Sequence, residues 1–179
     1  MTSLRFRAAD PEDAKDVALL HADSWRRHYR GAYADAYLDG DVVTDRAAEW
    51  SARLADQTGG ATVLAEDPAG LAGFVHVMFD KDAHWGSLVD NLHVSHDRQH
   101  GGIGTALMRH AAEAVASHAV HKSMYLWVLE QNAAAQGFYR AIGGTGVDRT
   151  SVPPPGGVPG RLTGEPRMLR MVWPDLAIR

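Results

Sequence analysis

The sequence predicts a mixed-sheet α/β (α+β) domain, and three observations lead to this prediction. Strand-like runs joined by short turns indicate antiparallel strands in the first half of the chain. A helical segment then separates two strand-like runs, which makes that pair parallel through a right-handed crossover. Two short strands close the sheet around a loop rich in proline and glycine. We therefore expect a single domain over residues 1–179, a length that can bury a full core.

Composition limits the classes of function. The chain has 18 Lys and Arg, 22 Asp and Glu and a formal net charge of −4 without charge runs, which argues against a nucleic-acid partner. It contains no cysteine, so disulfides, a thiolate nucleophile and cysteine-bound metals are excluded. No apolar run approaches the ~20 residues that cross a membrane, and the N-terminal residues lack the apolar stretch of a signal peptide. We expect a cytoplasmic protein with no membrane contact.

The individual elements follow from local patterns. Asp10 followed by Pro11 predicts a helix start, and the apolar periodicity continues to about Tyr29. Asp67-Pro68-Ala69-Gly70 between β-prone runs predicts a hairpin turn. The expected strands are residues 4–8, 62–66, 71–79, 84–94, 124–129, 146–151 and 168–173. The expected helices are residues 10–29, a short and a longer helix within 33–57, and residues 102–118 and 132–142.

Residues 90–106 predict an anion-binding site. The stretch begins as a strand in which Leu92 and Val94 share one face, and it ends in glycines that open an alanine-rich helix. Gly102 and Gly104 let the backbone approach a ligand with no Cβ in the way. The free N–H groups and the positive dipole end of the helix then point at that ligand. The expected ligand is therefore phosphorylated.

Other known signatures are missing from the sequence. Gly102-x-Gly104 lacks the third glycine of a dinucleotide fingerprint, and neither the G-K-[ST] of a P-loop nor the G-x-S-x-G of a hydrolase occurs. His93, His96 and His100 straddle a strand and a loop without the spacing of a tetrahedral site, so we expect no metal.

Two motifs stand one strand and one helix apart in the second half of the chain. The first, QHGGIG at residues 99–104, has the form Q/R-x-x-G-x-G/A. The second, NAAAQGFYRAIG at residues 132–143, has the form N-x-x-A-x-x-F-Y-x-x-x-G. With Leu92-x-Val94 before them, their order and spacing resemble the GNAT superfamily of N-acetyltransferases.

The resemblance implies a fold and a cofactor. The fold is a GNAT-like, mostly antiparallel sheet of six to seven strands with a parallel, splayed central pair, flanked by about four helices. The cofactor is acetyl-CoA as acetyl donor, with its pyrophosphate on the glycine loop and its pantetheine arm between the splayed strands. The cofactor-binding residues that the resemblance implies are Leu92, His93, Val94, Gln99, His100, Gly101, Gly102, Ile103, Gly104, Thr105, Asn132 and Tyr139.

The implied reaction is direct attack of a primary amine on the thioester in a ternary complex. The N–H groups of Leu92 and Val94 would polarise the thioester carbonyl, and Tyr139 would protonate the departing thiolate. A base is needed because amines are mostly protonated at pH 7. Asp90 is the first choice, because side chains alternate between the two faces of a strand and residues two apart, such as Asp90 and Leu92, share a face. His93 is the alternative, although parity places it on the opposite face unless a bulge intervenes, and a water relay is a third.

The acceptor side carries large aromatic residues. Trp25, Tyr29, Tyr33 and Trp127 either pack helices on the sheet or wall a substrate pocket. Members of the family that acetylate protein N-termini often carry a glutamate at the place of Trp127, so this sequence favours a small-molecule amine. Protein or peptide acetylation and a non-catalytic acyl-CoA-binding regulatory module stay open as alternatives. A homodimer is also open, because the family is often dimeric.

Overall fold

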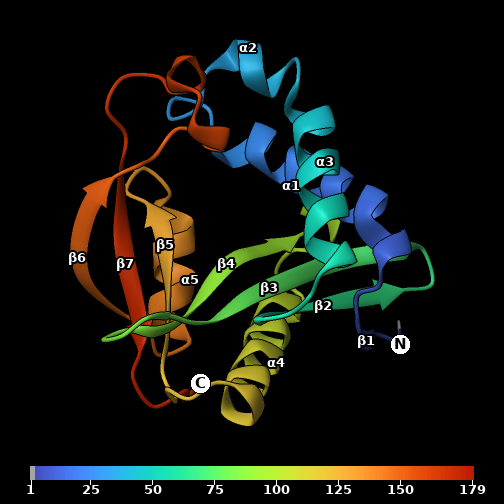
Figure 1. The fold of residues 1–179 in the computed structure, drawn as a ribbon, viewed down its shortest axis with the longest axis vertical. Helices are drawn as coiled ribbons and strands as arrows, with labels where there is room; N and C mark the ends of the chain where they lie inside the picture. Colours follow the sequence, from blue (N-terminus) through green and yellow to red (C-terminus); the bar gives the residue numbers. More distant parts are fainter. Residues whose placement is uncertain (1–2) are drawn as a thin grey trace.

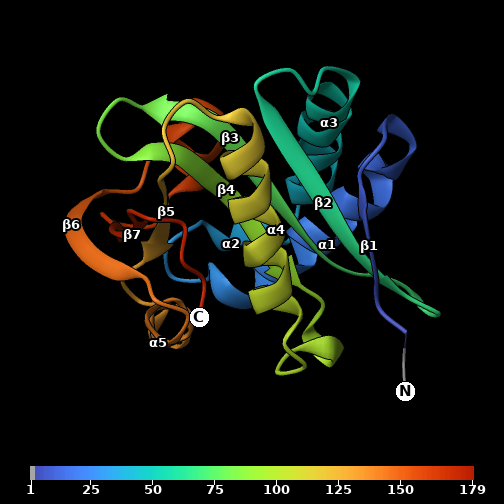
Figure 2. The same cartoon turned by 90° about the horizontal axis from the view of Figure 1, so that it is seen from below.

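The computed structural model describes residues 3–179, which form a seven-stranded sheet with helices on both faces (Figures 1 and 2). The strand order is β1-β2-β3-β4-β5-β7-β6. The strands are β1 (Arg5–Ala8), β2 (Gly60–Asp67), β3 (Gly70–Asp82), β4 (Gly86–Val94), β5 (Met124–Leu129), β6 (Thr145–Ser151) and β7 (Arg167–Trp173). The α-helices of the described chain are α1 (Ala14–His28), α2 (Asp35–Leu38), α3 (Val42–Ala55), α4 (Ile103–His118) and α5 (Ala133–Ala141). The predicted mixed sheet is confirmed.

The helices are divided between the two faces of the sheet. Helices α1 and α3 pack together over β3 and β4, above these strands in Figure 1. Helix α4 packs on the other face against β2, β3 and β4, and it lies in the foreground of Figure 2. Helix α5 lies on the same side as α4, behind β5. No helix within residues 3–179 has the length and apolar character needed to cross a membrane.

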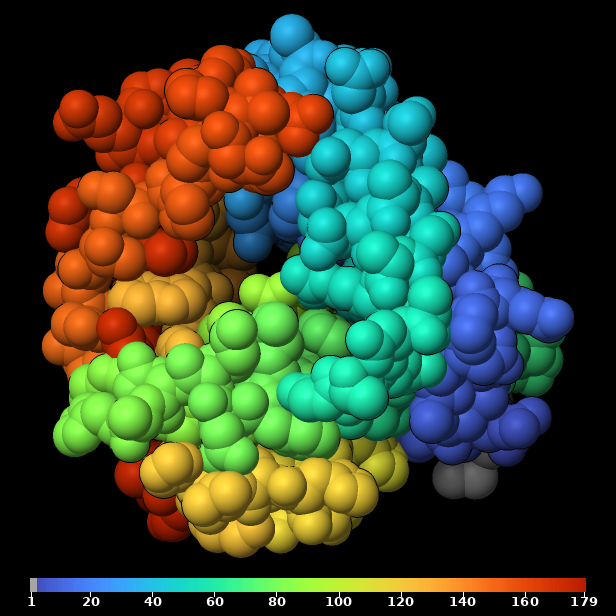
Figure 3. All heavy atoms as spheres, viewed as in Figure 1, coloured from blue at the N-terminus to red at the C-terminus, as the bar shows by residue number. Residues whose placement is uncertain are grey.

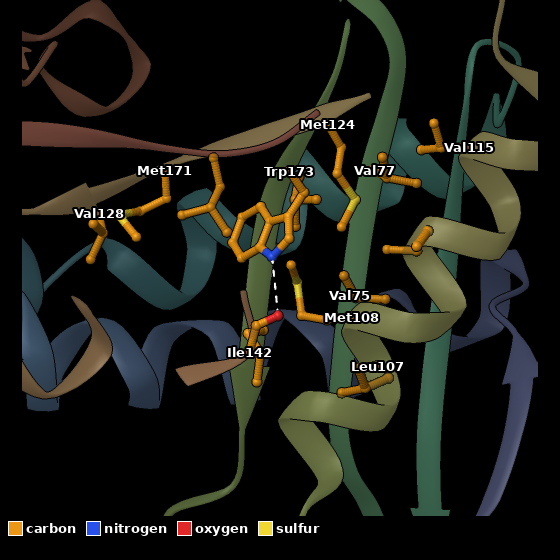
Figure 4. Packing of buried hydrophobic residues seen from close by; sticks show 14 of the residues in the cluster. Val75, Val77, Leu107, Met108, Val115, Met124, Val128, Ile142, Met171 and Trp173 are labelled. Atoms are coloured by element: carbon orange, nitrogen blue, oxygen red, sulfur yellow. Dashed lines mark hydrogen bonds between the residues drawn. The ribbon is translucent and has the colours of Figure 1, made fainter. Parts of the chain in front are cut away.

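The main core lies between α4 and the sheet (Figure 4). Leu107 and Met108 of α4 are fully buried against Val75 of β3 and Trp173 of β7. The indole N–H of Trp173 donates to the carbonyl of Ile142 over 3.3 Å, which ties the end of α5 to the last strand. This packing fixes the position of α4 and α5, whose first turns border the site described below.

The start of α1 follows the predicted capping signal. The Asp10 carboxylate accepts from the Glu12 N–H over 2.9 Å, and the Asp13 carboxylate accepts from the Asp10 N–H over 2.8 Å. The first turn, Pro11–Asp13, is a 3₁₀ turn that continues into α1. Such reciprocal bonds satisfy the free N–H groups at a helix N-terminus.

Strand β4 contains a bulge at Asp90. Its register with β3 pairs Asn91 with His76 and then Val89 with Val77, so Asp90 has no partner on β3. After the bulge, Leu92 packs in the core on the α4 side, whereas Asp90 forms an ion pair with Arg53 of α3 on the opposite face. The parity argument that placed Asp90 and Leu92 on one face was therefore wrong. The reason is that one inserted residue reverses the alternation of side chains.

Strands β4 and β5 are parallel and separate soon after they begin. Their backbone pairing is limited to Ser87 with Met124 and Leu88 with Tyr125. The predicted parallel, splayed central pair is thus confirmed. Beyond these two pairs, backbone groups of both strands face a gap instead of each other.

Candidate active site

A cavity of about 430 Å³ lies where β4 and β5 separate. This volume is within the usual range of small-molecule sites, roughly 300–1,000 Å³. The cavity extends from the loop before α4 to the first turns of α5. Of the twelve residues predicted to bind the cofactor, only Gly101 does not line it; those that do are Leu92, His93, Val94, Gln99, His100, Gly102, Ile103, Gly104, Thr105, Asn132 and Tyr139.

The loop that leads into α4 presents free backbone donors at one end of this cavity. Gly102 is the N-cap of α4 and has φ +80°, a left-handed conformation that favours glycine. The Ala106 N–H donates to the Gly102 carbonyl over 3.0 Å, which is the first bond of the helix. Among the described residues, the N–H groups of residues 99–105 find no backbone acceptor. The loop and helix start can therefore bind an anion.

The two glycines of the loop serve different purposes. A Cβ at Gly102 would meet nothing within 4 Å, so this position needs glycine for its backbone conformation. A Cβ at Gly104 would lie 3.1 Å from the Phe138 ring, which is tighter than most carbon contacts. Gly104 therefore lets α5 pack closely against α4, and it also lines the cavity, so its approach to a ligand stays a prediction.

Two backbone N–H groups of β4 face the gap. The Ser95 N–H donates to the Ala72 carbonyl of β3 over 2.8 Å. Because N–H groups alternate in direction along a strand, those of Leu92 and Val94 point away from β3 and toward the gap between β4 and β5. These two donors line one wall of the cavity.

Helix α5 contributes an amide and a phenol to the cavity. The Asn132 side chain caps the helix, because its Oδ1 accepts from the Ala135 N–H over 3.1 Å, and its NH₂ group stays free to donate. The Tyr139 ring packs against the Trp173 ring with centroids 6.0 Å apart. Burial, and to a lesser extent the nearby Tyr29, raises the pKa of Tyr139 well above its ordinary value of 10. Tyr139 is therefore a protonated phenol at neutral pH.

His93 lies in the wall of the cavity, which the bulge at Asp90 allows. Its side chain is buried, with Nδ1 2.7 Å from the Ser24 Oγ of α1, and its ring lies 4.6 Å from that of His21. Burial lowers the pKa of His93 to about 3; the charge of His28 acts in the same direction and that of Asp90 opposes it. The imidazole is therefore neutral at pH 7.

Asp90 is near the cavity but does not line it. The guanidinium of Arg53 lies 2.7 Å from its carboxylate and donates to the Asn91 side chain over 2.9 Å. Arg53 also binds Glu49 over 2.8 Å, so one cation joins α3 to the bulge. The Asp90 side chain remains 30% exposed on the α1–α3 face of the sheet.

The four predicted substrate-binding aromatics are divided between the core and the cavity. Tyr29 and Trp127 line the cavity. Trp25 and Tyr33 are buried in a second core cluster, where the Arg46 guanidinium lies 4.6 Å from the Trp25 ring centroid. Burial raises the pKa of Tyr29 to about 12, so its hydroxyl is also uncharged at pH 7.

Comparison with known proteins agrees with this geometry. Residues 10–143 match the model of the acetyltransferase (GNAT) family. The chain belongs to the GNAT family. The acetyltransferase is 31% identical over 139 residues to the uncharacterized N-acetyltransferase YuaI of Bacillus subtilis, which covers 75% of this chain and 76% of the relative. It is 32% identical over 141 residues to the probable N-acetyltransferase Rv2775 of Mycobacterium tuberculosis, with 77% and 78% covered.

A solved structure shares the fold. The PaiA N-acetyltransferase from Thermoplasma acidophilum, solved in complex with coenzyme A, superposes with a TM-score of 0.71. Its sequence is 19% identical, over 94% of this chain and 98% of that one. This likeness supports the architecture, and the family match supports acetyl transfer as the activity.

Eight residues that line the cavity of the acetyltransferase were not predicted from the sequence, and four of them carry polar or aromatic side chains: Ser24, His28, Arg98 and Phe138. Ser24 and His28 line the cavity from α1, one helical turn apart, and Phe138 packs under Gly104. Arg98 also lines the cavity, and its guanidinium is held by Asp67 over 2.8 Å. The basic residue directly before Gln99 and the Phe before Tyr139 were available signals, whereas nothing local marked the two α1 residues.

The histidines near the loop are separated by the fold. His93 is buried in β4, whereas His96 and His100 are exposed in the segment between β4 and α4. Within residues 3–179, no group of three His, Cys, Asp or Glu side chains is arranged to hold a metal ion. His100 lines the cavity and has φ +65°, so it belongs to the turn that presents the free N–H groups.

Proposed function

We propose that this acetyltransferase transfers the acetyl group of acetyl-CoA to a primary amine of a small molecule. The observation that carries the proposal is one continuous cavity of about 430 Å³ that connects the N-terminus of α4 with the hydroxyl-bearing ring of Tyr139. An anion site at one end and a protonated acid at the other match the two ends of the reacting half of acetyl-CoA.

The cavity residues can bind the cofactor at three places along its length. The pyrophosphate would accept from the N–H groups of residues 99–105, with the α4 dipole adding to the attraction. The pantetheine arm would enter the gap between β4 and β5 and use strand N–H and C=O groups that have no partner there. The free NH₂ of Asn132 would donate to a carbonyl of the arm.

The chemistry then follows from the donors around the thioester. The amine nitrogen attacks the carbonyl carbon, whose oxygen is polarised by the Leu92 and Val94 N–H groups. The C–N bond forms, the C–S bond breaks, and the sulfur takes the hydroxyl proton of Tyr139. Tyr139 suits this role because burial keeps it protonated. The remaining ammonium proton must pass to a base.

We propose that His93 takes this proton and that Asp90 supports it. His93 lines the cavity and is neutral at pH 7; in the tautomer whose Nδ1–H donates to the Ser24 Oγ, the lone pair on Nε2 can accept the proton. The Asp90 carboxylate does not line the cavity and is held by Arg53, but its charge offsets part of the lowering of the His93 pKa by burial and so partly stabilises the protonated imidazole. Asp90 as the direct base, our first choice from the sequence, would need a water between it and the amine.

The segment between β6 and β7 supports a small acceptor. The Thr163 N–H donates to the Ala32 carbonyl, and the Ala34 N–H donates to the Arg161 carbonyl, each over 2.8 Å. The Arg161 guanidinium also lies 3.2 Å from the Asp45 carboxylate of α3. The segment thus packs on the loop between α1 and α2, and Figure 3 shows a hollow bordered by this segment (orange), α3 (cyan) and β4 (green). A long peptide would need an open groove here.

The test is release of CoA thiol from acetyl-CoA by the purified protein. We expect release with at least one small primary amine, and none when acetyl-CoA is incubated alone. Release with peptides but with no small amine would replace the small-molecule proposal by peptide acetylation. Acetyl-CoA that binds tightly and is recovered intact with every amine would instead indicate a binding module. Cytoplasmic residence and a homodimer stay predictions.

A further inference from the structure

A guanidinium enclosed by aromatic rings lies beside the cavity. The Arg170 Cζ on β7 is 4.4 Å from the Trp127 ring centroid and 5.2 Å from that of Tyr125, both on β5. The Trp85 ring, at the start of β4, lies 5.1 Å away on another side. Only 14% of the Arg170 side chain is exposed. Such stacking fixes the plane of the guanidinium and leaves its edges to bind a ligand.

The hydrogen-bonding capacity of this guanidinium is not satisfied by the protein. Its Nε lies 2.9 Å from the Asp148 carboxylate but out of line, and it is a buried atom without a hydrogen bond among the described residues. Asp82 is 3.9 Å from one terminal nitrogen, too far for a hydrogen bond. Asp148 is half exposed on the edge strand β6. A donor that is removed from water without an acceptor is unfavourable, and the terminal nitrogens have no hydrogen-bond acceptor in the described part of the chain, which points to a missing partner.

Arg170 is placed on the acceptor side of the thioester. It is directly opposite Trp127 in the β5–β7 register, and Trp127 lines the cavity. Both side chains are on the face that carries α1 and α3, because Leu126 and Met171, adjacent to them along the strands, pack in the α4 core. No helix of the described chain covers this face of β5, β7 and β6 (Figure 1). An acceptor that contacts both Arg170 and the thioester would lie along this face.

We propose that Arg170 binds a carboxylate of the acceptor, so that the substrate is an amine that also carries an acidic group. This proposal rests on the amine acetyltransferase function proposed above. The planar fork of a guanidinium matches a carboxylate and binds it through two parallel hydrogen bonds. Arg170 is one strand beyond β5, so the carboxylate lies about 7–10 Å from the reacting amine, or one and a half to two strand spacings.

The test uses two acceptors that differ only in charge, 6-aminohexanoate and its carboxamide, 6-aminohexanamide. We expect the wild-type enzyme to have a lower KM for the acid than for the amide. Arg170→Gln should raise the ratio of KM for the acid to KM for the amide roughly 10- to 100-fold, the effect of losing a charge-assisted hydrogen bond. Arg170→Lys should restore the ratio only in part, because it keeps the charge and loses the fork. Glycine and glycinamide are too short to span the distance, so their KM ratio should be the same in the wild-type enzyme and in Arg170→Gln.

Two further variants separate a binding role from a structural one. Asp148→Asn removes the competing carboxylate and should lower KM for the acid and not for the amide. Arg149→Gln removes an exposed cation of the neighbouring strand, paired with Glu130, and should leave the ratio unchanged. A ratio that stays constant in Arg170→Gln while both acceptors are acetylated overturns the proposal and spares the proposed function.

An equilibrium measurement keeps the proposal testable without turnover. Calorimetry with protein saturated with CoA should show weaker binding of 6-aminohexanoate to Arg170→Gln than to wild type, with the amide unaffected by the substitution. If no primary amine releases thiol, the acetyltransferase function fails, and calorimetry still decides the carboxylate site. Equal binding of the acid by both proteins refutes it.

Discussion

Replacement of Tyr139 by phenylalanine is the sharpest test of the proposed mechanism. The phenol lies in the cavity wall, and burial is the main reason that its pKa is raised above the ordinary value of 10. The substitution removes one hydroxyl and keeps the ring that packs against Trp173 at 6.0 Å and Phe138 at 5.2 Å. The change is therefore confined to the group that would give up the proton.

The expected magnitudes differ for stability and rate. The packing of the ring is unchanged, so the free energy of unfolding should change by less than about 1 kcal/mol. If Tyr139 is the general acid, kcat should fall roughly 10²–10⁴-fold, the usual contribution of such a group. KM for acetyl-CoA should change little, because the hydroxyl acts on the departing sulfur and not on the pyrophosphate end.

The assay follows CoA thiol release under saturating acetyl-CoA, with urea denaturation of both proteins as the stability control. Phe138→Leu offers a matched comparison, since it alters the neighbouring ring and leaves the hydroxyl in place. An unchanged kcat in Tyr139→Phe refutes the acid role. A loss of rate that is accompanied by an equal loss of folded protein would assign the effect to structure.

Three further predictions concern stability. Gly104→Ala should cost about 1–3 kcal/mol in urea denaturation because its Cβ meets the Phe138 ring at 3.1 Å, whereas Gly137→Ala, with nothing within 4 Å, should stabilise α5 by roughly 0.5–1 kcal/mol. Burial lowers the pKa of His76 to about 4, so below pH 6.5 the unfolded chain binds a proton that the native state does not, and stability falls as the pH drops toward 4. His76→Asn should reduce that slope by about 1.4 kcal/mol per pH unit, and equal slopes would contradict the assignment. Arg53→Met should cost roughly 1–3 kcal/mol, because it leaves the carboxylate at the bulge and a buried amide without their shared donor.

The cavity residues around the α4 and α5 N-termini could be predicted from the sequence because their determinants are local. A left-handed Gly102, a helix start and an N-capping Asn132 are properties of a few consecutive residues. Hydrophobic periodicity likewise predicted the order of strands and helices, including the parallel pair of β4 and β5. Local signals of this kind need no knowledge of distant contacts.

The acceptor half could not be predicted in the same way, because it depends on contacts between distant residues. One inserted residue at Asp90 moved that carboxylate to Arg53, 37 positions earlier in the chain, and turned His93 into the cavity. The pattern of side chains in β4 gives no sign of the bulge. Ser24 and Arg170 come from opposite ends of the chain, and only the assembled fold places Ser24 in the cavity wall and Arg170 beside Trp127, which also lines the cavity.

Burial sets the protonation states of the base and the acid in the proposed mechanism, His93 and Tyr139, and this has a consequence for the pH profile. It lowers the pKa of His93 to about 3 and raises that of Tyr139 above 10, so the base is neutral and the acid is protonated throughout the intervening range. Neither group then titrates between pH 5 and 9, and the acceptor amine is the group that limits the rate. We expect log(kcat/KM) to rise with pH with unit slope up to the pKa of each amine tested. A change in the slope of log(kcat/KM) near pH 6.5 that is the same for amines of different pKa, and is absent in His93→Gln, would contradict this expectation. It would show that His93 titrates as an ordinary imidazole.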